Sequence, residues 1–341
     1  MLTRLTRSSQ ASNLATAVRG AILRAIKLRS DKQVVFYAKM AVGLLVLVAV
    51  GRYVSQTLRK VQDRGLRVHV DPGWIALAIV LYLAGLIAFG VFFWRVLRDS
   101  PTPVPLLPAL RAYLISHLGK YVPGKALVVV MRVALVVPYR AGTATAAFAT
   151  LYETLVMMAT GGLFAALGFA LVPIERWPAL VALGLGFGLL VVVDPSVFPK
   201  ISRMISAPLR GIDAEAFPRV TRRLLLEGIG WSLLGWCLLG LSQVAVVWAI
   251  APTGVAVERW PLIIASVALA TVAGFVVAVF PGGLGVREGV LMATLGPAVG
   301  ADTAVLAALI LRLAWVLGEF VAALPLLVAR PSVPLPEATA S

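Results

Sequence analysis

Two short stretches place basic side chains beside Pro-Gly pairs inside segments that are otherwise apolar. The first is Lys120-Tyr121-Val122-Pro123-Gly124-Lys125, and the second is Pro281-Gly282-Gly283-Leu284-Gly285-Val286-Arg287-Glu288. Glycine permits tight turns and close approach of a ligand to the backbone, and a helix that begins there directs free N–H groups and its positive dipole end at an anion. Both stretches therefore predict a site for an anion, and phosphate is the common anion of membranes.

Further charges lie within apolar segments. Arg132 follows Lys125 by seven residues, which is two turns along one helical face, so we assign it and Arg312 to the same site. A charge at mid-bilayer costs at least ~2.5–3.5 kcal/mol on insertion scales and needs a partner. The buried basic residues outnumber the acids Glu153, Glu288 and Glu319, which predicts that part of the partner is an anionic ligand. The basic residues are Arg111, Lys120, Lys125, Arg132, Arg287 and Arg312.

The acids have more than one interpretation. Glu153 is either a counter-ion for the hairpin lysines, which we favour, or a proton site. Glu319 stands seven residues after Arg312, so these two form either a structural pair, with each other or with Glu288, or part of the binding site. For His117, a hydrogen-bonded core position is favoured over a proton carrier.

Other chemistry is disfavoured. There is no metal-ligand cluster and no nucleophile–base pair with recognisable spacing, so we expect no enzyme, metal or cofactor. Residues 119–125 match the glycine and lysine pattern of a nucleotide-binding loop, but Ala126 follows in place of Ser or Thr and no strand precedes it. A glycine run at Gly184, Gly186 and Gly188 is better interpreted as a helix-packing face.

Composition identifies the environment in which these residues act. Hydrophobic residues make up 60% of the 341 and charged residues only 13%, against roughly a quarter charged in soluble domains. The apolar runs are about 20 residues long, which is the length of a membrane-spanning helix. With its basic residues between and inside such runs, the net charge of +16 predicts anionic lipid, and not nucleic acid, as the partner.

We expect an all-α polytopic membrane protein with about six spanning helices. These cover residues 34–54, 73–94, 144–172, 177–193, 229–250 and 303–328. Two further segments, 105–138 and 261–297, are broken near their middle and predict re-entrant hairpins. The first would be ~51 Å long as one helix, too long for a single crossing. In the second, the leading arm 261–280 is itself long enough to span.

The order of these segments predicts an internal repeat. Units 73–172 and 229–328 each contain a helix, a hairpin and a helix, and the extra span between them gives the units opposite directions, as in inverted-repeat transporters. Residues 1–33 are predicted to be a basic cytoplasmic segment, either an interfacial helix or a disordered tail. A single transmembrane domain then covers 34–330, and 331–341 is a disordered tail.

Charge predicts the orientation. With both termini cytoplasmic, inner segments hold 17 Lys/Arg and outer ones seven, which fits the cytoplasmic (inner) membrane. The loop 52–71 is an exception, since it places five basic residues outside. Either this loop forms an outer amphipathic helix, or the first predicted span is misplaced.

The stretches HLGKYVPGKALVVVMR and FPGGLGVREG resemble the two signatures of flippase-like membrane proteins related to the transmembrane region of lysylphosphatidylglycerol synthase. The resemblance covers nearly all of the chain after residue 34. It implies spanning helices with paired re-entrant hairpins, and translocation of phospholipids, aminoacylated lipids or polyprenyl-phosphate-linked sugars. The matching residues are Lys120, Tyr121, Pro123, Gly124, Arg132, Pro281, Gly283, Gly285, Arg287 and Glu288.

The synthase carries a soluble aminoacyl-transferase domain after its membrane region, whereas this sequence stops at Ser341, so we expect translocation without aminoacylation. The leading hypothesis is flipping of an anionic phospholipid or polyprenyl-phosphate-linked lipid. One alternative is a non-transporting partner that presents a lipid-linked sugar to a glycosyltransferase. Another is an ion-coupled carrier of a soluble anion with Glu153 or Glu288 as the proton site.

Overall fold

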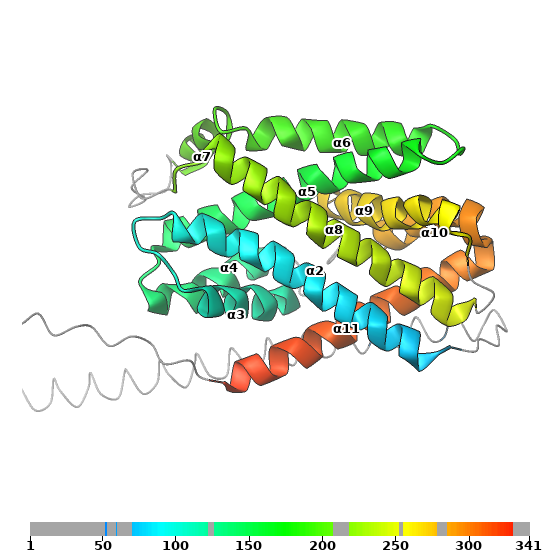
Figure 1. Cartoon of the computed structure of the whole chain (residues 1–341). Coiled ribbons are helices and arrows are strands. Elements are labelled where there is room, and N and C mark those ends of the chain that lie inside the picture. Colours follow the sequence, from blue (N-terminus) through cyan, green and yellow to red (C-terminus); the bar gives the residue numbers. More distant parts are fainter. Residues whose placement is uncertain are drawn as a thin grey trace, which may run out of the picture. The chain divides into compact units, whose positions relative to one another are not determined.

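The computed structural model describes Arg52, Arg59 and residues 70–121, 126–206, 218–251, 255–277 and 285–329. Contacts divide the chain into Met1–Gly51 and Arg52–Ser341, and all described residues lie in the second unit. They form helices joined by short turns (Figure 1). The α-helices are α2 (Pro72–Arg98), α3 (Leu106–Ser116), α4 (Ala126–Val136), α5 (Thr143–Ala170), α6 (Trp177–Val193), α7 (Phe198–Ser206), α8 (Arg222–Ile250), α9 (Trp260–Val276), α10 (Val286–Val299) and α11 (Ala301–Val328).

The helices confirm a polytopic all-α membrane protein. Within the described residues, five helices are long and apolar enough to cross a bilayer: α2, α5, α8, α11 and the stretch Val257–Val276 that contains α9. The α6 helix has 17 residues and reaches spanning length only together with α7, from which it is bent by 73°. The predicted span 34–54, the basic segment 1–33 and the tail 331–341 lie outside the described residues, as does most of the loop 52–71.

Local chemistry explains where several helices begin. Asp71 caps α2 by accepting a hydrogen bond from Gly73 N at 2.7 Å, with Pro72 in the first turn. Thr221 caps α8 in the same way, accepting from Leu224 N at 3.1 Å. The start of α2 agrees with the predicted residue 73, whereas α8 begins seven residues before the predicted residue 229, because Thr221 caps it ahead of the polar turn that contains Arg222 and Arg223.

The first broken segment is a pair of half-length helices. Helices α3 and α4 have 11 residues each, about 16 Å at 1.5 Å per residue, which is half of a ~30 Å hydrocarbon core. They pack against each other, and the short 3₁₀ helix η1 (His117–Tyr121) carries the chain from α3 toward the break. Arg132 on α4 faces Ser116 at the end of α3, with 3.0 Å between Nε and Oγ.

The second broken segment also folds back on itself. Arg259 in the 3₁₀ helix η4 (Val257–Arg259), just before α9, donates from Nη1 to the Ala298 carbonyl near the end of α10, at 2.6 Å. The two arms are therefore antiparallel. Gly285 begins α10 with φ of +84°, a conformation that favours glycine, and its N–H donates to Glu288 Oε2 at 2.7 Å. With 14 residues, α10 is too short to span, whereas the leading arm is long enough.

Helices α2 and α8, the first helices of the two predicted units, lie side by side and antiparallel (Figure 1). Asp71 N donates to the Ala249 carbonyl at 2.9 Å at one end, and Arg95 Nε donates to Glu227 Oε2 at 2.8 Å at the other. Because these helices occupy the same place in their units, the units run in opposite directions.

The remaining helix contacts are arranged in matching pairs. The α2–α3 contact corresponds to α8–α9, and α4–α5 corresponds to α10–α11. The last helix of each unit also packs on the leading hairpin arm of the other, as α5 does on α9 and α11 on α3. This pattern is what an inverted repeat produces. Among the described helices α6 has no counterpart, and it packs mainly on α5.

Small residues allow close helix contacts. A Cβ added to Gly186 of α6 would stand 2.5 Å from Leu163 N, and one added to Gly162 would stand 2.6 Å from Gly186 Cα. Gly186 therefore lies in a packed face, as predicted. Gly184 and Gly188 have open space around the Cβ position, so the prediction was wrong for these two.

Candidate functional site

A carboxylate on α11 accepts hydrogen bonds from side chains of two other elements. Glu319 Oε1 accepts hydrogen bonds from Tyr82 of α2 and from Lys120 of η1, and its Oε2 accepts from Tyr121 of η1 at 2.8 Å. The Glu319 side chain is completely buried, while 23% of the Lys120 side chain is exposed. The tip of the first hairpin is thus tied to both α2 and α11 through one buried group.

Aromatic rings support the cations around this carboxylate. Trp315, one turn before Glu319, stacks on Tyr82 with 4.2 Å between centroids. The Arg287 guanidinium, from the start of α10, lies 4.3 Å from the centre of the Trp315 ring, and that of Arg312 lies 5.6 Å from the Tyr121 ring. Such cation–π contacts hold a desolvated guanidinium in place. We call Tyr82, Lys120, Tyr121, Arg287, Arg312, Trp315 and Glu319 the tip cluster.

Positive charge is in excess in the tip cluster. Lys120, Arg287 and Arg312 are its cations, and both arginines are more than nine-tenths buried. Glu319 is its carboxylate. Adding Glu288, which caps α10 beside Arg287, still leaves three cations against two acids among the described residues. Since a net charge held away from water is costly, a further anion would stabilise this arrangement.

A second buried cluster is electrically balanced. Arg132 of α4 forms an ion pair with Glu153 of α5, with 2.8 Å between Nη1 and Oε2, and both residues are at most 2% exposed. Tyr113 donates to Glu153 Oε1 at 3.0 Å. The Arg132 guanidinium also lies 4.1 Å from the Tyr113 ring centre and 5.0 Å from that of Phe93. This pair fastens the first hairpin to α5 and has the features of a structural contact.

The predicted site residues separate accordingly. The tip cluster contains Lys120, Tyr121, Arg287 and Arg312, with Gly285 and Glu288 at the adjoining start of α10. Arg132 lies in the second cluster. Pro123, Gly124, Lys125, Pro281, Gly282 and Gly283 lie outside the described residues.

The acids pair with residues other than those considered from the sequence. Glu153, expected to be a counter-ion for the hairpin lysines, pairs with Arg132 of the trailing arm. Glu319, weighed as a partner of Arg312, pairs with Lys120, which is 199 positions away. A spacing of seven residues places two side chains on one face of a helix. Which neighbouring helix that face contacts depends on how the helix is rotated about its axis, and packing sets this rotation. His117 lies against Tyr113, with 5.0 Å between rings and 3.3 Å from Nδ1 to the Tyr113 carbonyl oxygen.

Sequence reasoning predicted Tyr121 but missed the other two aromatic members of the tip cluster. Tyr82 and Trp315 lie in apolar runs and resemble ordinary membrane residues, yet both are buried and hydrogen-bonded. The available signal is their polar atom, since a buried Tyr hydroxyl or Trp N–H nearly always has a partner. Trp315 Nε1 donates to Ser242 of α8 at 3.0 Å, which connects the tip cluster to the α2–α8 contact.

Comparison with protein families identifies the chain. A family model described as the lysylphosphatidylglycerol synthase TM region matches residues 34–322. No curated protein matched the sequence. The match includes both broken segments, the tip cluster and the Arg132–Glu153 pair. The chain therefore belongs to the family of the transmembrane region of lysylphosphatidylglycerol synthase.

Proposed function

We propose that this membrane protein translocates an anionic phospholipid or a polyprenyl-phosphate-linked lipid across the bilayer. The family indicates a role connected with membrane lipids. The observation that carries the proposal is the excess of buried positive charge where the first hairpin tip meets the start of α10. A phosphate would supply the missing negative charge, and its acyl chains would stay in the surrounding hydrocarbon.

The chemistry of the tip cluster suits a phosphate group. Guanidinium and ammonium groups form strong charge-assisted hydrogen bonds with phosphate oxygens, and tyrosine hydroxyls add neutral donors. The cluster draws its members from α2, η1, α10 and α11, so a bound head group would contact both inverted units. Such a position between repeats is where inverted-repeat transporters hold their substrates.

Reconstituted protein tests the proposal. Vesicles would contain a fluorescently labelled phosphatidylglycerol whose outer-leaflet fraction is quenched by a membrane-impermeant reductant. We expect wild-type protein to expose inner-leaflet label. Arg287→Gln should slow exposure on the order of tenfold, equivalent to about 1.4 kcal/mol, and Lys125→Ala should slow it as well. Unchanged rates in both variants would refute the site assignment.

A matched control is available away from both hairpins. Arg176 is exposed and directly precedes α6, which packs mainly on α5. Arg176→Gln removes a positive charge of the same kind without touching the tip cluster or a hairpin contact, so it should flip lipid at the wild-type rate. Slowing by this variant would indicate a general effect of charge removal.

The same vesicles distinguish the other candidate functions. A partner that presents a lipid-linked sugar would bind labelled anionic lipid without flipping it and would co-purify with a glycosyltransferase. A carrier of a soluble anion would move that anion across vesicles made of neutral phospholipid, to which no anionic lipid substrate has been added. Flipping of the label by purified protein alone supports translocation.

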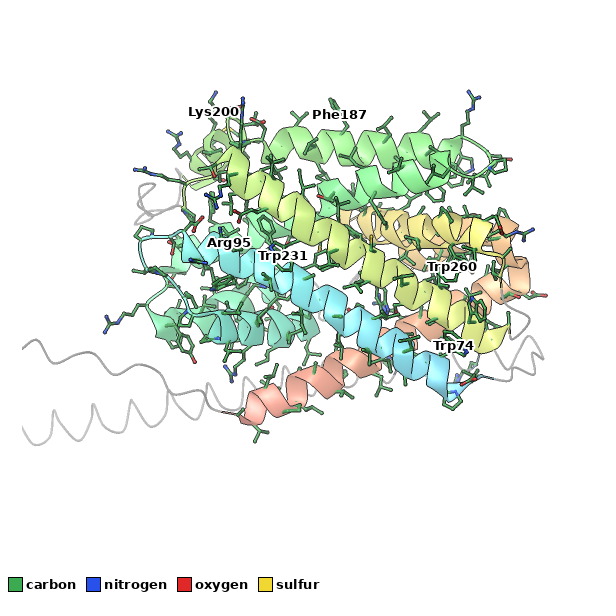
Figure 2. The ribbon with its side chains drawn as sticks, in the orientation of Figure 1. Trp74, Arg95, Phe187, Lys200, Trp231 and Trp260 are labelled. Atoms are coloured by element: carbon green, nitrogen blue, oxygen red, sulfur yellow. The ribbon has the colours of Figure 1, made fainter. Side chains whose placement is uncertain are left out.

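We also propose that the protein lies in the cytoplasmic membrane with its basic end toward the cytoplasm. Figure 2 places Arg95 and Lys200 toward one end of the helices and Trp74 and Trp260 toward the other. The exposed basic residues near the first end are Arg98, Arg140, Lys200, Arg203, Arg219, Arg222 and Arg223. Labelling of single cysteines at Arg140 and Arg176 in intact cells tests the orientation, since only the second should react with an impermeant reagent.

A further inference from the structure

We propose that Glu319 is a built-in competitor for the ligand's phosphate, and that its contacts with Lys120 and Tyr121 form a latch which ligand binding opens. This inference rests on the proposed function, because it concerns the same anion site. It adds a named residue that opposes binding and a defined element, η1, that binding would release.

The hydrogen-bond donors around Glu319 are of the kind that would also bind a phosphate group. Both carboxylate oxygens are used: Oε1 by the Tyr82 hydroxyl and the Lys120 ammonium, and Oε2 by the Tyr121 hydroxyl. The Lys120 ammonium also stands 3.3 Å from the Tyr82 hydroxyl. A phosphodiester, like this carboxylate, presents two anionic oxygens that accept hydrogen bonds, and a phosphomonoester presents three. A ligand phosphate and Glu319 therefore compete for the same donors.

The surrounding positive charge favours replacement of the Glu319 carboxylate by a phosphate as the partner of these donors. Arg287 lies on the Trp315 ring and Arg312 near the Tyr121 ring, so two further cations stand close to Glu319. His117, in η1, lies against Tyr113. A phosphate that enters meets more positive charge than Glu319 and Glu288 together balance.

The two partners of the latch differ in their freedom to move. Glu319 is on the 28-residue α11, its side chain is fully buried, and Trp315 one turn earlier is fixed by stacking on Tyr82. Lys120 is on a five-residue 3₁₀ helix next to the break in the hairpin, and its side chain is partly exposed. Short 3₁₀ segments have weak hydrogen-bond geometry and often mark hinges. Lys120, together with η1, is therefore the partner that would move away from Glu319 when the ligand binds.

A direct binding measurement tests the latch. Purified full-length protein in detergent is titrated with dioctanoyl phosphatidic acid, with inorganic phosphate, and with dioctanoyl phosphatidylcholine. Glu319→Gln keeps the side-chain shape and an acceptor oxygen but removes the competing charge. We expect it to bind phosphatidic acid on the order of tenfold more tightly than wild type, and Lys120→Met to abolish the gain in the Gln background. Tighter binding of inorganic phosphate alone would assign the site to a soluble anion.

Hydrogen exchange provides a second readout that a purely structural role would not produce. Amides of residues 117–121 should exchange faster in Glu319→Gln, and also in wild type when phosphatidic acid is bound. The matched control is Glu227→Gln, which alters a partly exposed carboxylate paired with Arg95. It should leave both the affinity and the exchange of η1 unchanged.

The outcomes separate the two proposals. Equal affinities in wild type and Glu319→Gln overturn the latch and leave the lipid site intact. Binding to neither protein overturns the lipid site, and the latch with it. If Glu319→Gln does not fold, Glu319→Asp retains the charge but withdraws the carboxylate by one methylene, and its affinity should lie above that of wild type. An Asp variant that binds more weakly than wild type also overturns the latch.

Discussion

Replacing Arg132 by methionine would remove one partner of the buried ion pair and leave the other behind. Glu153, at 1% exposure, would retain only Tyr113 at 3.0 Å and Thr154 at 3.3 Å as hydrogen-bond partners. The converse variant, Glu153→Met, would leave a guanidinium at 2% exposure with Ser116 and the two aromatic rings.

The magnitude follows from the geometry. At a separation of 2.8 Å and an effective dielectric constant of ~20, the attraction between Arg132 and Glu153 is about 6 kcal/mol. Desolvation of both groups offsets most of this in the intact pair, but a single substitution loses the attraction and keeps the desolvation cost. Each single variant should therefore lose about 3–5 kcal/mol of stability.

The double variant should be far less affected than the sum of the two. With methionine at both positions no charge remains buried in this second cluster, and Ser116 still donates to the Tyr113 carbonyl at 2.9 Å. Only the Tyr113 hydroxyl loses its acceptor there, at roughly 1–2 kcal/mol. The coupling between the two substitutions should exceed about 2 kcal/mol.

Thermal unfolding in detergent, followed by tryptophan fluorescence at one scan rate, measures these differences. Each single variant should lower the Tm on the order of 10 °C, while the double variant stays close to wild type. If the single variants kept the wild-type Tm but stopped lipid flipping, the pair would belong to the binding site, as the sequence pattern suggested for Arg132. An additive double variant would also contradict the assignment as a structural pair.

Two further predictions concern helix packing and a hairpin hydrogen bond. Gly235→Ala would place a Cβ 2.4 Å from the ring of Phe89, so it should destabilise the protein by roughly 1–3 kcal/mol. Gly230→Ala, with nothing within 4 Å of the added Cβ, should be neutral or gain up to ~1 kcal/mol, and equal Tm values for the two variants would contradict this. Arg259→Met should remove the bond to Ala298 and cost roughly 0.5–1.5 kcal/mol, seen as faster hydrogen exchange at the end of α10, and unchanged exchange there would show that the bond does not fasten the hairpin.

Hydropathy was sufficient to predict most of the described fold. The runs 73–94 and 144–172 correspond to α2 and α5 because a bilayer requires helices of about that length, and Pro-Gly pairs cannot continue a helix. Contacts between helices were harder to predict. Lys120 and Glu319 are far apart in sequence, and their pairing depends on how α2, η1 and α11 are rotated about their axes. That rotation is set by many small packing contacts, which charge and spacing do not encode.

The α2–α8 contact restricts how the two repeat units can move relative to each other. Gly85 receives Leu239, and Gly228 receives the ring of Phe92, so closely that an added Cβ would stand 2.3 Å from either side chain. Helices interlocked in this way cannot slide or rock past one another without losing that fit. Under the proposed function, alternating access through rigid rotation of one repeat unit against the other is therefore disfavoured. Movement would fall instead to short elements such as η1 at the tip of the first hairpin, beside an α2–α8 wall that stays fixed.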